Sequence, residues 1–434
     1  MRLSRRADDA ENAPLPVTVR ARLARWLSTS PAARYVLAAI ALAVVVAAGF
    51  AVRYWLRPNA TPAGPPGTIA PTASVGQELR DPTDKGRVLL PLVARGLLTL
   101  APSPTSEPSP RPKPAEPTST PTPAPVDFAS VRQELQSEGK DLAYVKLGFH
   151  TGPGGTARGL GTYLSALAGV GVPAVIKSVG DYGVCVQALR ESPDHVTIFR
   201  MTGGELELPS YDLPPETAAD QHWARIREAL PPEFDQRTWL EVMNEPDKAR
   251  ADWLGRFASR TAQLALRDGY RFAAFGWSSG EPEPEHWQTP GMLAFLRLAS
   301  QHPDRIAVAL HEYSYDVDNI ANQYPALVGR FQTLFRICDQ DGIGRPTVLI
   351  TEWGWEYTRV PPVEQAMKDI AWASQLYAAY PEVRGAGIWY LGGSYGGIAD
   401  RAQRLILPLR YYTWSTYFVI EPGQKPTDPG RFAP

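Results

Sequence analysis

The chain has 434 residues, and its 44 lysines and arginines against 45 aspartates and glutamates give a formal net charge of −1. Binding the phosphates of nucleic acid needs a clear basic excess, so nucleic acid is excluded as the main partner. The length exceeds that of an average domain and leaves room for segments outside a folded core.

An uncharged apolar stretch, YVLAAIALAVVVAAGFAV, spans residues 35–52. As a helix it would be about 27 Å long, close to the thickness of the hydrocarbon core of a bilayer. Together with the interfacial sequence YWL at 54–56, it predicts a transmembrane helix over residues 35–56. The alternative is a cleaved signal peptide, although the charged segment and the apolar stretch are both longer than a signal peptide usually has.

The arginines around this stretch predict its orientation. Four of them lie between residues 20 and 34, whereas only Arg53 and Arg57 follow closely. By the positive-inside rule, residues 1–34 form a cytoplasmic tail and the rest of the chain is extracytoplasmic. The sequence therefore predicts a single-pass protein of the cell membrane.

Residues 57–126 are predicted to form a disordered, proline-rich stalk. Between residues 101 and 125, proline recurs at almost every second or third position, a composition that stays extended as polyproline II and cannot pack a core. At about 3.1 Å per residue this part reaches on the order of 80 Å and would hold a domain away from the membrane. The apolar stretch 86–100, interrupted by Pro91, either packs on the folded domain or lies at a surface.

From residue 127 to residue 434, short apolar runs alternate with amphipathic segments such as 252–269 and 363–380. Near-continuous apolar runs indicate strands buried on both faces, as in a parallel sheet. Eight strand–helix units in roughly 300 residues predict an α/β fold, the closed (β/α)8 TIM barrel, with an open doubly wound sheet as the structural alternative. The predicted strands are 143–149, 174–179, 196–201, 239–243, 271–277, 306–313, 347–353 and 386–391.

Polar and aromatic side chains occupy the ends of these predicted strands. In such barrels the chemistry lies at the carboxyl ends of the strands, and core-facing residues would be branched aliphatics. The composition suits a polar, ring-shaped ligand. The residues are His150, Lys177, Arg200, Glu245, Trp277, His311, Tyr313, Glu352 and Trp389.

Two carboxylates stand out among them. Glu245 follows the fourth predicted strand and Glu352 ends the seventh, so their side chains can converge across the barrel mouth. Glycoside hydrolysis needs such a pair, one protonated to help the leaving oxygen depart and one ionised to attack the sugar carbon, about 5–5.5 Å apart in a retaining enzyme. Repulsion and burial are expected to raise the pKa of one of the two.

Four short features resemble the large clan of retaining (β/α)8 glycoside hydrolases that includes cellulases, mannanases and xylosidases. They are MNEP at 243–246, HEY at 311–313, TEWG at 351–354, and Trp389. The resemblance covers the chain from about residue 127 onwards and points to no single family. It implies cleavage of O-glycosidic bonds in a poly- or oligosaccharide by double displacement, with Glu245 as general acid/base and Glu352 as nucleophile.

The same resemblance implies roles for neighbouring side chains. Asn244 would hydrogen-bond the sugar 2-hydroxyl, Tyr313 would orient the nucleophile with His311 nearby, and Trp389 would form the floor under the sugar. The arginine that the clan usually places near the nucleophile would be Arg200, although its strand does not match cleanly. With two further strand-end candidates, the predicted substrate-binding residues are Asn244, His311, Tyr313, Trp389, Arg200, Trp277 and His150.

Other motifs favour other chemistry less well. GWSSG at 276–280 fits a nucleophile elbow, but the prolines that follow forbid the helix that this motif needs. GPGGTA at 152–157 imitates a dinucleotide fingerprint, but nothing later suggests nicotinamide chemistry, and we expect a flexible rim loop. No cluster has metal-ligand spacing, so neither a cofactor nor a metal is predicted. Cys185 and Cys338 are interpreted as buried packing residues.

The sequence therefore predicts a membrane-anchored glycoside hydrolase with a monomeric catalytic domain and a carbohydrate substrate. A carbohydrate-binding barrel that lacks catalysis and is tethered to the cell envelope is the alternative. A transglycosylase would use the same residues. The sugar, the linkage and the choice between endo and exo cleavage are not specified by these patterns.

Overall fold

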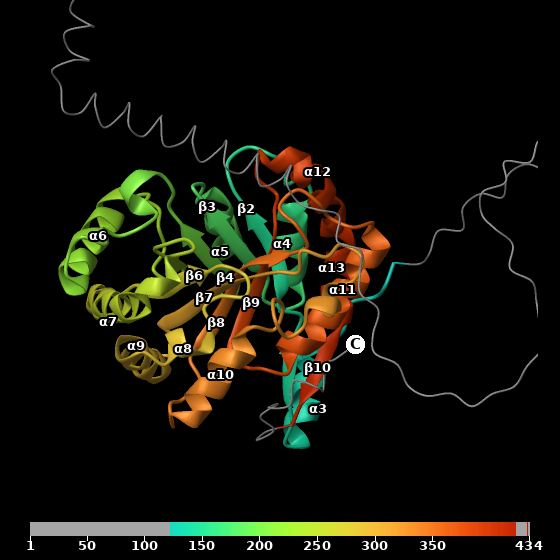
Figure 1. Cartoon of the computed structure of the whole chain (residues 1–434). Helices are drawn as coiled ribbons and strands as arrows, with labels where there is room; N and C mark the ends of the chain where they lie inside the picture. The colour runs from blue at the N-terminus through green and yellow to red at the C-terminus, as the bar shows by residue number, and fades with distance from the viewer. Residues whose placement is uncertain (1–121, 422–431, 433–434) are drawn as a thin grey trace, which may run out of the picture. The chain divides into compact units, whose positions relative to one another are not determined.

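The computed structural model describes residues 122–421 and Phe432, which belong to one compact unit (Figure 1). The predicted cytoplasmic tail (1–34), the transmembrane helix (35–56) and nearly all of the predicted stalk (57–126) lie outside the described residues. Within the described part, no helix is long and apolar enough to cross a membrane.

Eight parallel strands close into a barrel in the order β2 to β9, with helices around its outside (Figure 1). Strand β9 pairs with β2 as well as with β8, so the sheet has no free edge. The predicted barrel is confirmed, and the open doubly wound sheet is wrong. The strands are β2 (Leu147–Thr151), β3 (Val175–Val179), β4 (Val196–Arg200), β5 (Trp239–Glu241), β6 (Arg271–Trp277), β7 (Ile306–Tyr313), β8 (Thr347–Gly354) and β9 (Val383–Ile388).

The first predicted strand, 143–149, is two strands. β1 (Asp141–Tyr144) pairs antiparallel with β10 (Tyr417–Ile420) outside the barrel, and only β2 belongs to the barrel. Between them the chain turns at Lys146, whose Nζ donates to the carbonyl oxygen of Tyr377 in the last turn of α11 (Val363–Ala378), 3.0 Å away, and to that of Tyr380 just after it, 2.8 Å away. The apolar run continues through this turn, which is why the sequence pattern does not reveal the break.

The last strand was predicted at 386–391, three residues further along the chain than the observed β9 at both ends. β9 starts at Val383, which pairs with Val348 of β8, and ends at Ile388. The remaining apolar residues, Trp389 to Leu391, lie beyond the strand end and are buried by the loops there. Burial of a loop thus imitates burial of a strand in the sequence.

The helices pack an apolar face on the barrel. In α7 (Ala251–Asp268) apolar residues recur every three or four positions, and Leu254 and Phe257 are fully buried. Burying each is worth about 1.5–3 kcal/mol. The other helices are α3 (Phe128–Ser137), α4 (Leu160–Gly169), α5 (Gly183–Glu191), α6 (Pro215–Ala229), α8 (Pro284–Trp287), α9 (Pro290–Gln301), α10 (Phe331–Gln340), α12 (Ile398–Ala402) and α13 (Ile406–Ser415).

The barrel interior is built in layers. Trp239 of β5 fills the space left by small residues on neighbouring strands, and at Gly385 of β9 a Cβ would come within 2.7 Å of Val175. Two residues beyond Ile198 and Trp239 the same inward face carries Arg200 and Glu241 instead. The apolar layer consists of Ile198, Trp239, Ala273, Ala307, Ala309 and Leu349.

Candidate active site

Glu352 lies on β8 with its side chain inside the barrel mouth and only 7 % exposed. Its Oε2 accepts a hydrogen bond of 2.8 Å from the Tyr313 hydroxyl. Its Oε1 lies 3.6 Å from Nη2 of Arg200 and 3.8 Å from Nε2 of His150. A buried carboxylate surrounded by donors and a cation is held in one orientation.

Tyr313 is fitted to donate to that carboxylate. Burial, and then the charge of Glu352, raise the pKa of Tyr313 well above its ordinary value, so the hydroxyl keeps its proton. Burial, helped by the charges of Lys177 and Arg200, lowers the pKa of His150 well below its ordinary value. The imidazole of His150 therefore faces Glu352 as a neutral group.

Glu245 sits in the loop after β5, and its side chain is 36 % exposed. The backbone has φ 43°, a left-handed conformation that is uncommon for glutamate, and its N–H donates to the Gly276 carbonyl at 2.9 Å. Its Oε1 accepts from the Ser278 hydroxyl at 3.1 Å and lies 3.1 Å from Nδ1 of His311. The carboxylate therefore faces the mouth from an open loop, opposite the enclosed Glu352.

The imidazole of His311 links the two carboxylates. Nδ1 lies 3.1 Å from Oε1 of Glu245 and 3.6 Å from Oε2 of Glu352. The nearest oxygens of the two carboxylates cannot be further apart than these two distances combined. Two acids from opposite sides of the barrel therefore meet around one nitrogen, as the sequence pattern predicts.

The ionisation of Glu245 differs from what the sequence predicts of such a pair. The hydrogen bond from His311 is the largest influence, and with the charge of His311 it outweighs burial, so the pKa of Glu245 is lowered. Repulsion between the carboxylates was expected to raise the pKa of one of them, and at Glu245 the donor between them reverses that effect.

A second charged layer lies directly below this pair. Nζ of Lys177 is 2.6 Å from Oε1 of Glu241, both side chains are fully buried, and Nε of Arg200 lies 3.6 Å from the same oxygen. Burial alone would raise the pKa of Glu241, but the charges of Lys177 and Arg200 lower it; burial lowers the pKa of Lys177 to about 8. Arg200 thus stands between two carboxylates, Glu241 and Glu352.

Glu241 is the important residue that the sequence interpretation missed. It is the last residue of β5, four residues before Glu245, and a two-residue alternation from Trp239 would have placed it inside the barrel. The strand was predicted to run to residue 243, whereas it ends at Glu241, so the search for polar groups at strand ends passed over this carboxylate.

Aromatic rings form one wall of the mouth. Trp389 stacks on Tyr390 with ring centroids 4.3 Å apart, and its Nε1 donates to the Tyr357 carbonyl at 3.2 Å. The hydroxyls of Tyr315 and Tyr357 lie 3.0 Å apart. Three tyrosines here are exposed, Tyr315 at 45 %, Tyr357 at 41 % and Tyr395 at 46 %. Exposed aromatic faces beside a buried acid suit the apolar face of a sugar ring.

Two other candidates have different outcomes. Asn244 lies beside Glu245, and its Oδ1 is buried without a hydrogen-bond partner among the described residues, so it is available to a ligand. Trp277 does not join the cluster, because its fully buried ring packs outward on Trp287 of α8, 6.1 Å away. A bulge in β6 at residues 275–277 puts Gly276 on the inside, within reach of Glu241 and His311.

Backbone strain gathers at the same end of the barrel. Non-glycine residues with positive φ cost on the order of 1–3 kcal/mol and concentrate at functional sites. Within residues 122–421 all of them lie in or after the carboxyl-terminal half of a strand. They are Glu245, Phe275, Tyr315, Ser394 and Tyr395.

The rejected motifs have structural roles. After GWSSG the chain forms only the four-residue α8, and the Ser279 hydroxyl oxygen accepts a hydrogen bond of 2.6 Å from the backbone N–H of Tyr313. The GPGGTA loop packs on the segment after β9, where a Cβ on Gly155 would come within 2.3 Å of Leu391 O. Cys185 and Cys338 are free and buried, which raises the pKa of both thiols.

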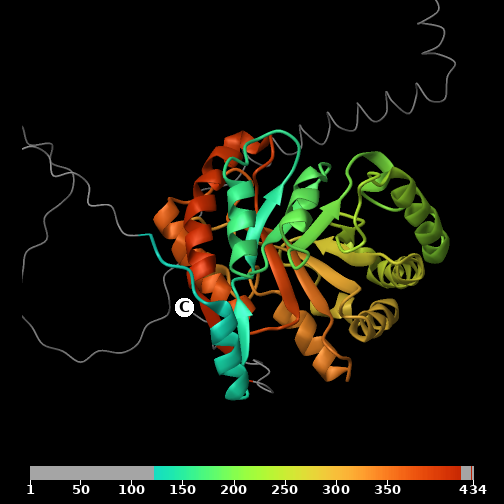
Figure 2. The same cartoon turned by 180° about the vertical axis from the view of Figure 1, so that it is seen from behind.

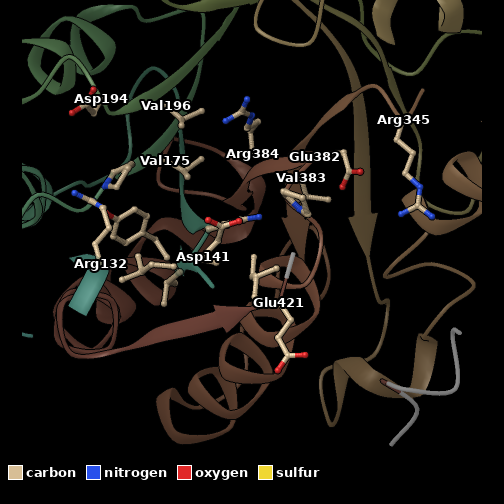
Figure 3. Close-up of a pocket in the computed structure, with 18 of the residues that line it drawn as sticks. Arg132, Asp141, Val175, Asp194, Val196, Arg345, Glu382, Val383, Arg384 and Glu421 are labelled. Atoms are coloured by element: carbon tan, nitrogen blue, oxygen red, sulfur yellow. The ribbon is translucent and has the colours of Figure 1, made fainter. Parts of the chain in front are cut away.

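A different cavity of about 790 Å³ lies at the other end of the barrel, where β3, β4 and β9 begin (Figure 3). Its cations have partners, such as Arg384 with Asp304 at 3.1 Å and Arg345 with Asp339 at 2.5 Å. The amino-terminal end of a TIM barrel serves stability, whereas chemistry lies at the carboxyl end. We therefore take the mouth with Glu245 and Glu352 as the candidate active site.

Among the described residues, no group of three or more His, Cys, Asp or Glu side chains is arranged to hold a metal ion. No protein-family model matches the sequence, and no curated protein matches it.

The solved structures that are similar to this chain include a xyloglucanase and an aldolase. A family 5 xyloglucanase from Paenibacillus pabuli, solved with a ligand, is 13 % identical with a TM-score of 0.36, over 62 % of this chain and 99 % of that chain. The YdjI aldolase from Escherichia coli is 10 % identical with a TM-score of 0.28, over 67 % of this chain and 98 % of that chain. At these scores neither likeness bears on activity, and the geometry of the site has to carry that argument.

Proposed function

We propose that the barrel is a glycoside hydrolase that cleaves O-glycosidic bonds of a poly- or oligosaccharide with retention of configuration. The observation that carries this proposal is the meeting of two carboxylates around Nδ1 of His311, at 3.1 Å from Glu245 and 3.6 Å from Glu352. Both carboxylates can therefore reach one anomeric carbon, and retention is proposed from the resemblance of MNEP and TEWG to retaining enzymes.

Glu352 is the proposed nucleophile. Its side chain is only 7 % exposed, which keeps bulk water away. The hydrogen bond from Tyr313 and the charge of Arg200 hold the carboxylate group in one orientation. In the first step an oxygen of Glu352 bonds to the anomeric carbon while the bond to the leaving oxygen breaks. In the second step water attacks that carbon and the carboxylate leaves.

Glu245 is the proposed general acid/base. Its carboxyl group gives a proton to the leaving oxygen and later takes one from the attacking water. The pKa of Glu245 is lowered in the free protein, so protonation has to follow substrate binding. A sugar covering the exposed third of this side chain would desolvate it and raise its pKa.

Substrate contacts follow from the same geometry. Oδ1 of Asn244 is a buried acceptor without a partner among the described residues, and a sugar hydroxyl would satisfy it. Trp389 and Tyr390 offer a stacked aromatic floor, and Tyr315 and Tyr357 a rim. His150 lines the inner wall through its ring contact with Trp389, at 4.9 Å between centroids.

The test is turnover of activated aryl glycosides and polysaccharides by the purified chain, with Glu245→Gln and Glu352→Gln as controls. We expect Glu352→Gln to lose at least about 10³-fold in kcat, because the covalent step is lost. Glu245→Gln should lose less on substrates with good leaving groups, which need no acid. Proton NMR of the first-formed product should show the anomer of the substrate.

A carbohydrate-binding barrel without catalysis is the second candidate, and the lowered pKa of Glu245 favours it. It predicts sugar binding without turnover, unchanged in both glutamine variants. An excess of transfer products over free sugar would instead indicate a transglycosylase.

The setting of the barrel is also a proposal. We retain the single-pass anchor at 35–56, with an extracytoplasmic and monomeric catalytic domain, from the sequence alone. Protease added outside the cell membrane should cut the domain. If the domain is protected until that membrane is permeabilised, the orientation is reversed.

A further inference from the structure

Three arginines line a cavity of about 310 Å³ on the outside of the barrel, with no acidic side chain among the lining residues. It lies between the first turn of α4 and the first turn of α13, two helices that run side by side (Figures 1 and 2). The side chains that matter here are Arg158, Thr162, Gln403, Arg404, Leu407 and Arg410.

The positive charge of this cavity is not balanced within the described residues. Some surface arginines have carboxylate partners, as Arg256 has Glu216 and Arg260 has Asp220, but no carboxylate among the described residues pairs with Arg158, Arg404 or Arg410. The guanidinium group of Arg410 lies over the rings of Tyr411 and Trp414, 5.0 and 5.3 Å from their centroids, and its buried Nε has no hydrogen-bond partner among the described residues. Three like charges around one hollow repel one another, and a bound anion would offset that cost.

The backbone adds to the positive potential. Helix α4 begins at Leu160, and its N-cap, Gly159, which also lines the cavity, offers no side chain to its first amide groups. The amino-terminal end of a helix favours an anion. This contribution is secondary to the arginines, whose planar guanidinium groups can bind a carboxylate, sulfate or phosphate through two hydrogen bonds.

The rest of the lining suits a sugar ring rather than a bare ion. Leu407 is 50 % exposed and offers an apolar face, whereas Thr162 and Gln403 offer hydrogen-bonding groups. We propose that this cavity binds an acidic saccharide, with the arginines holding its carboxylate, sulfate or phosphate. The saccharide part of the proposal rests on the proposed function; the anion part does not.

A short chain of contacts joins this cavity to the candidate active site. The Gln403 side chain is hydrogen-bonded to the Thr156 hydroxyl, and Thr156 N donates to the Leu391 carbonyl at 3.1 Å. Leu391 follows Trp389 and Tyr390, the floor of the mouth. One polysaccharide chain can therefore occupy the mouth and also reach this cavity. The arginines of the cavity would then favour binding of acidic over neutral polysaccharides.

The experiment measures binding of polygalacturonate oligomers to the full-length chain by titration calorimetry, at several salt concentrations. We expect Arg158→Gln and Arg404→Gln each to weaken binding on the order of tenfold, and the salt dependence to become shallower. The matched control is Arg297→Gln, an exposed arginine on α9, which should leave binding unchanged. Turnover of a small neutral aryl glycoside should be the same in all three variants.

Three comparison probes decide the chemistry. Neutral cello-oligosaccharides that bind as well as the acidic oligomers would overturn the proposal, as would equal loss in Arg297→Gln. Inorganic phosphate that displaces the oligomers at equal affinity would indicate a small-anion site instead. Binding only to phosphatidylglycerol vesicles, and not to phosphatidylcholine vesicles or oligomers, would indicate a membrane contact. Anion binding without any glycosidase activity would refute the proposed function and leave the arginine site standing.

Discussion

Glu241 is a fully buried carboxylate whose partner, Lys177, is a fully buried ammonium group 2.6 Å away. Such pairs are often no more stabilising than an apolar replacement, so their presence needs another reason. Arg200 supplies one, because its Nε lies 3.6 Å from Glu241 and its Nη2 lies 3.6 Å from Glu352. We therefore propose that Glu241 is a positioning residue that holds Arg200 beneath Glu352, the proposed nucleophile.

Replacing Glu241 tests how much this residue contributes to the free energy of unfolding and how much to kcat/KM. We expect Glu241→Gln to lower the free energy of unfolding by about 3–5 kcal/mol, because Lys177 is left as an uncompensated buried charge. kcat/KM should fall on the order of 100-fold as Arg200 moves. Both are measured on the same preparation, by denaturant unfolding and by initial rates.

The double variant Glu241→Gln/Lys177→Met provides the control. Removing both charges should return most of the lost stability, since no buried ion then lacks a partner. Because Arg200 still lacks Glu241, kcat/KM should stay low. Recovery of kcat/KM together with stability would mean that the pair is structural only.

At the scale of elements, one buried acid ties a barrel strand to two helices. Glu312 faces outward from β7, between the inward His311 and Tyr313. Its Oε2 accepts from the Tyr377 hydroxyl of α11 at 2.7 Å and from Gly329 N, just before α10, at 2.9 Å. Burial raises the pKa of Glu312 to about 7, against hydrogen bonds that lower it.

This connection predicts a pH dependence of stability. Between pH 4.5 and 7 the folded state holds a proton on Glu312 that the unfolded chain has released, so its contribution to the free energy of unfolding falls as pH rises. The contribution is complete below pH 4.5 and lost above pH 7, about 3 kcal/mol in all. The free energy of unfolding of Glu312→Gln, relative to that of the wild type, should therefore rise by the same amount between pH 4.5 and 7.5. Denaturant unfolding at a series of pH values measures this difference.

Glu364→Gln, on the exposed side of α11, is the control for this series. Glu364 pairs with Lys368 in solvent, and such pairs contribute little. A difference between wild type and Glu312→Gln that does not change with pH would show that Glu312 titrates normally.

For the whole molecule, periodicity was enough to predict the barrel, because burial on both faces leaves continuous apolar runs. Strand-end positions predicted that Glu245 and Glu352 lie close together, as they do around His311, and their catalytic roles stay a prediction. They failed where tertiary context decides. The turn at Lys146 is stabilised by carbonyls from α11, far away in sequence. The bulge in β6 turns Trp277 away from the mouth. Neither effect leaves a local pattern.

The two ends of the barrel should respond differently to mutation. Trp239 fills the apolar layer between the amino-terminal end and the charged layer, so Trp239→Phe leaves a cavity and should cost about 1–3 kcal/mol of unfolding free energy. It should leave kcat/KM within about twofold, because Arg200 and Glu241 keep their partners.

Glu245→Gln should do the opposite, with loss of turnover and unchanged or slightly greater stability, because active-site groups are held at a cost to the fold. Parallel unfolding curves and initial rates for the two variants make the comparison. If Trp239→Phe lost turnover as completely as Glu245→Gln while its unfolding curve stayed in place, the apolar layer would be part of the site, and the division of the barrel into a stabilising end and a chemical end would fail.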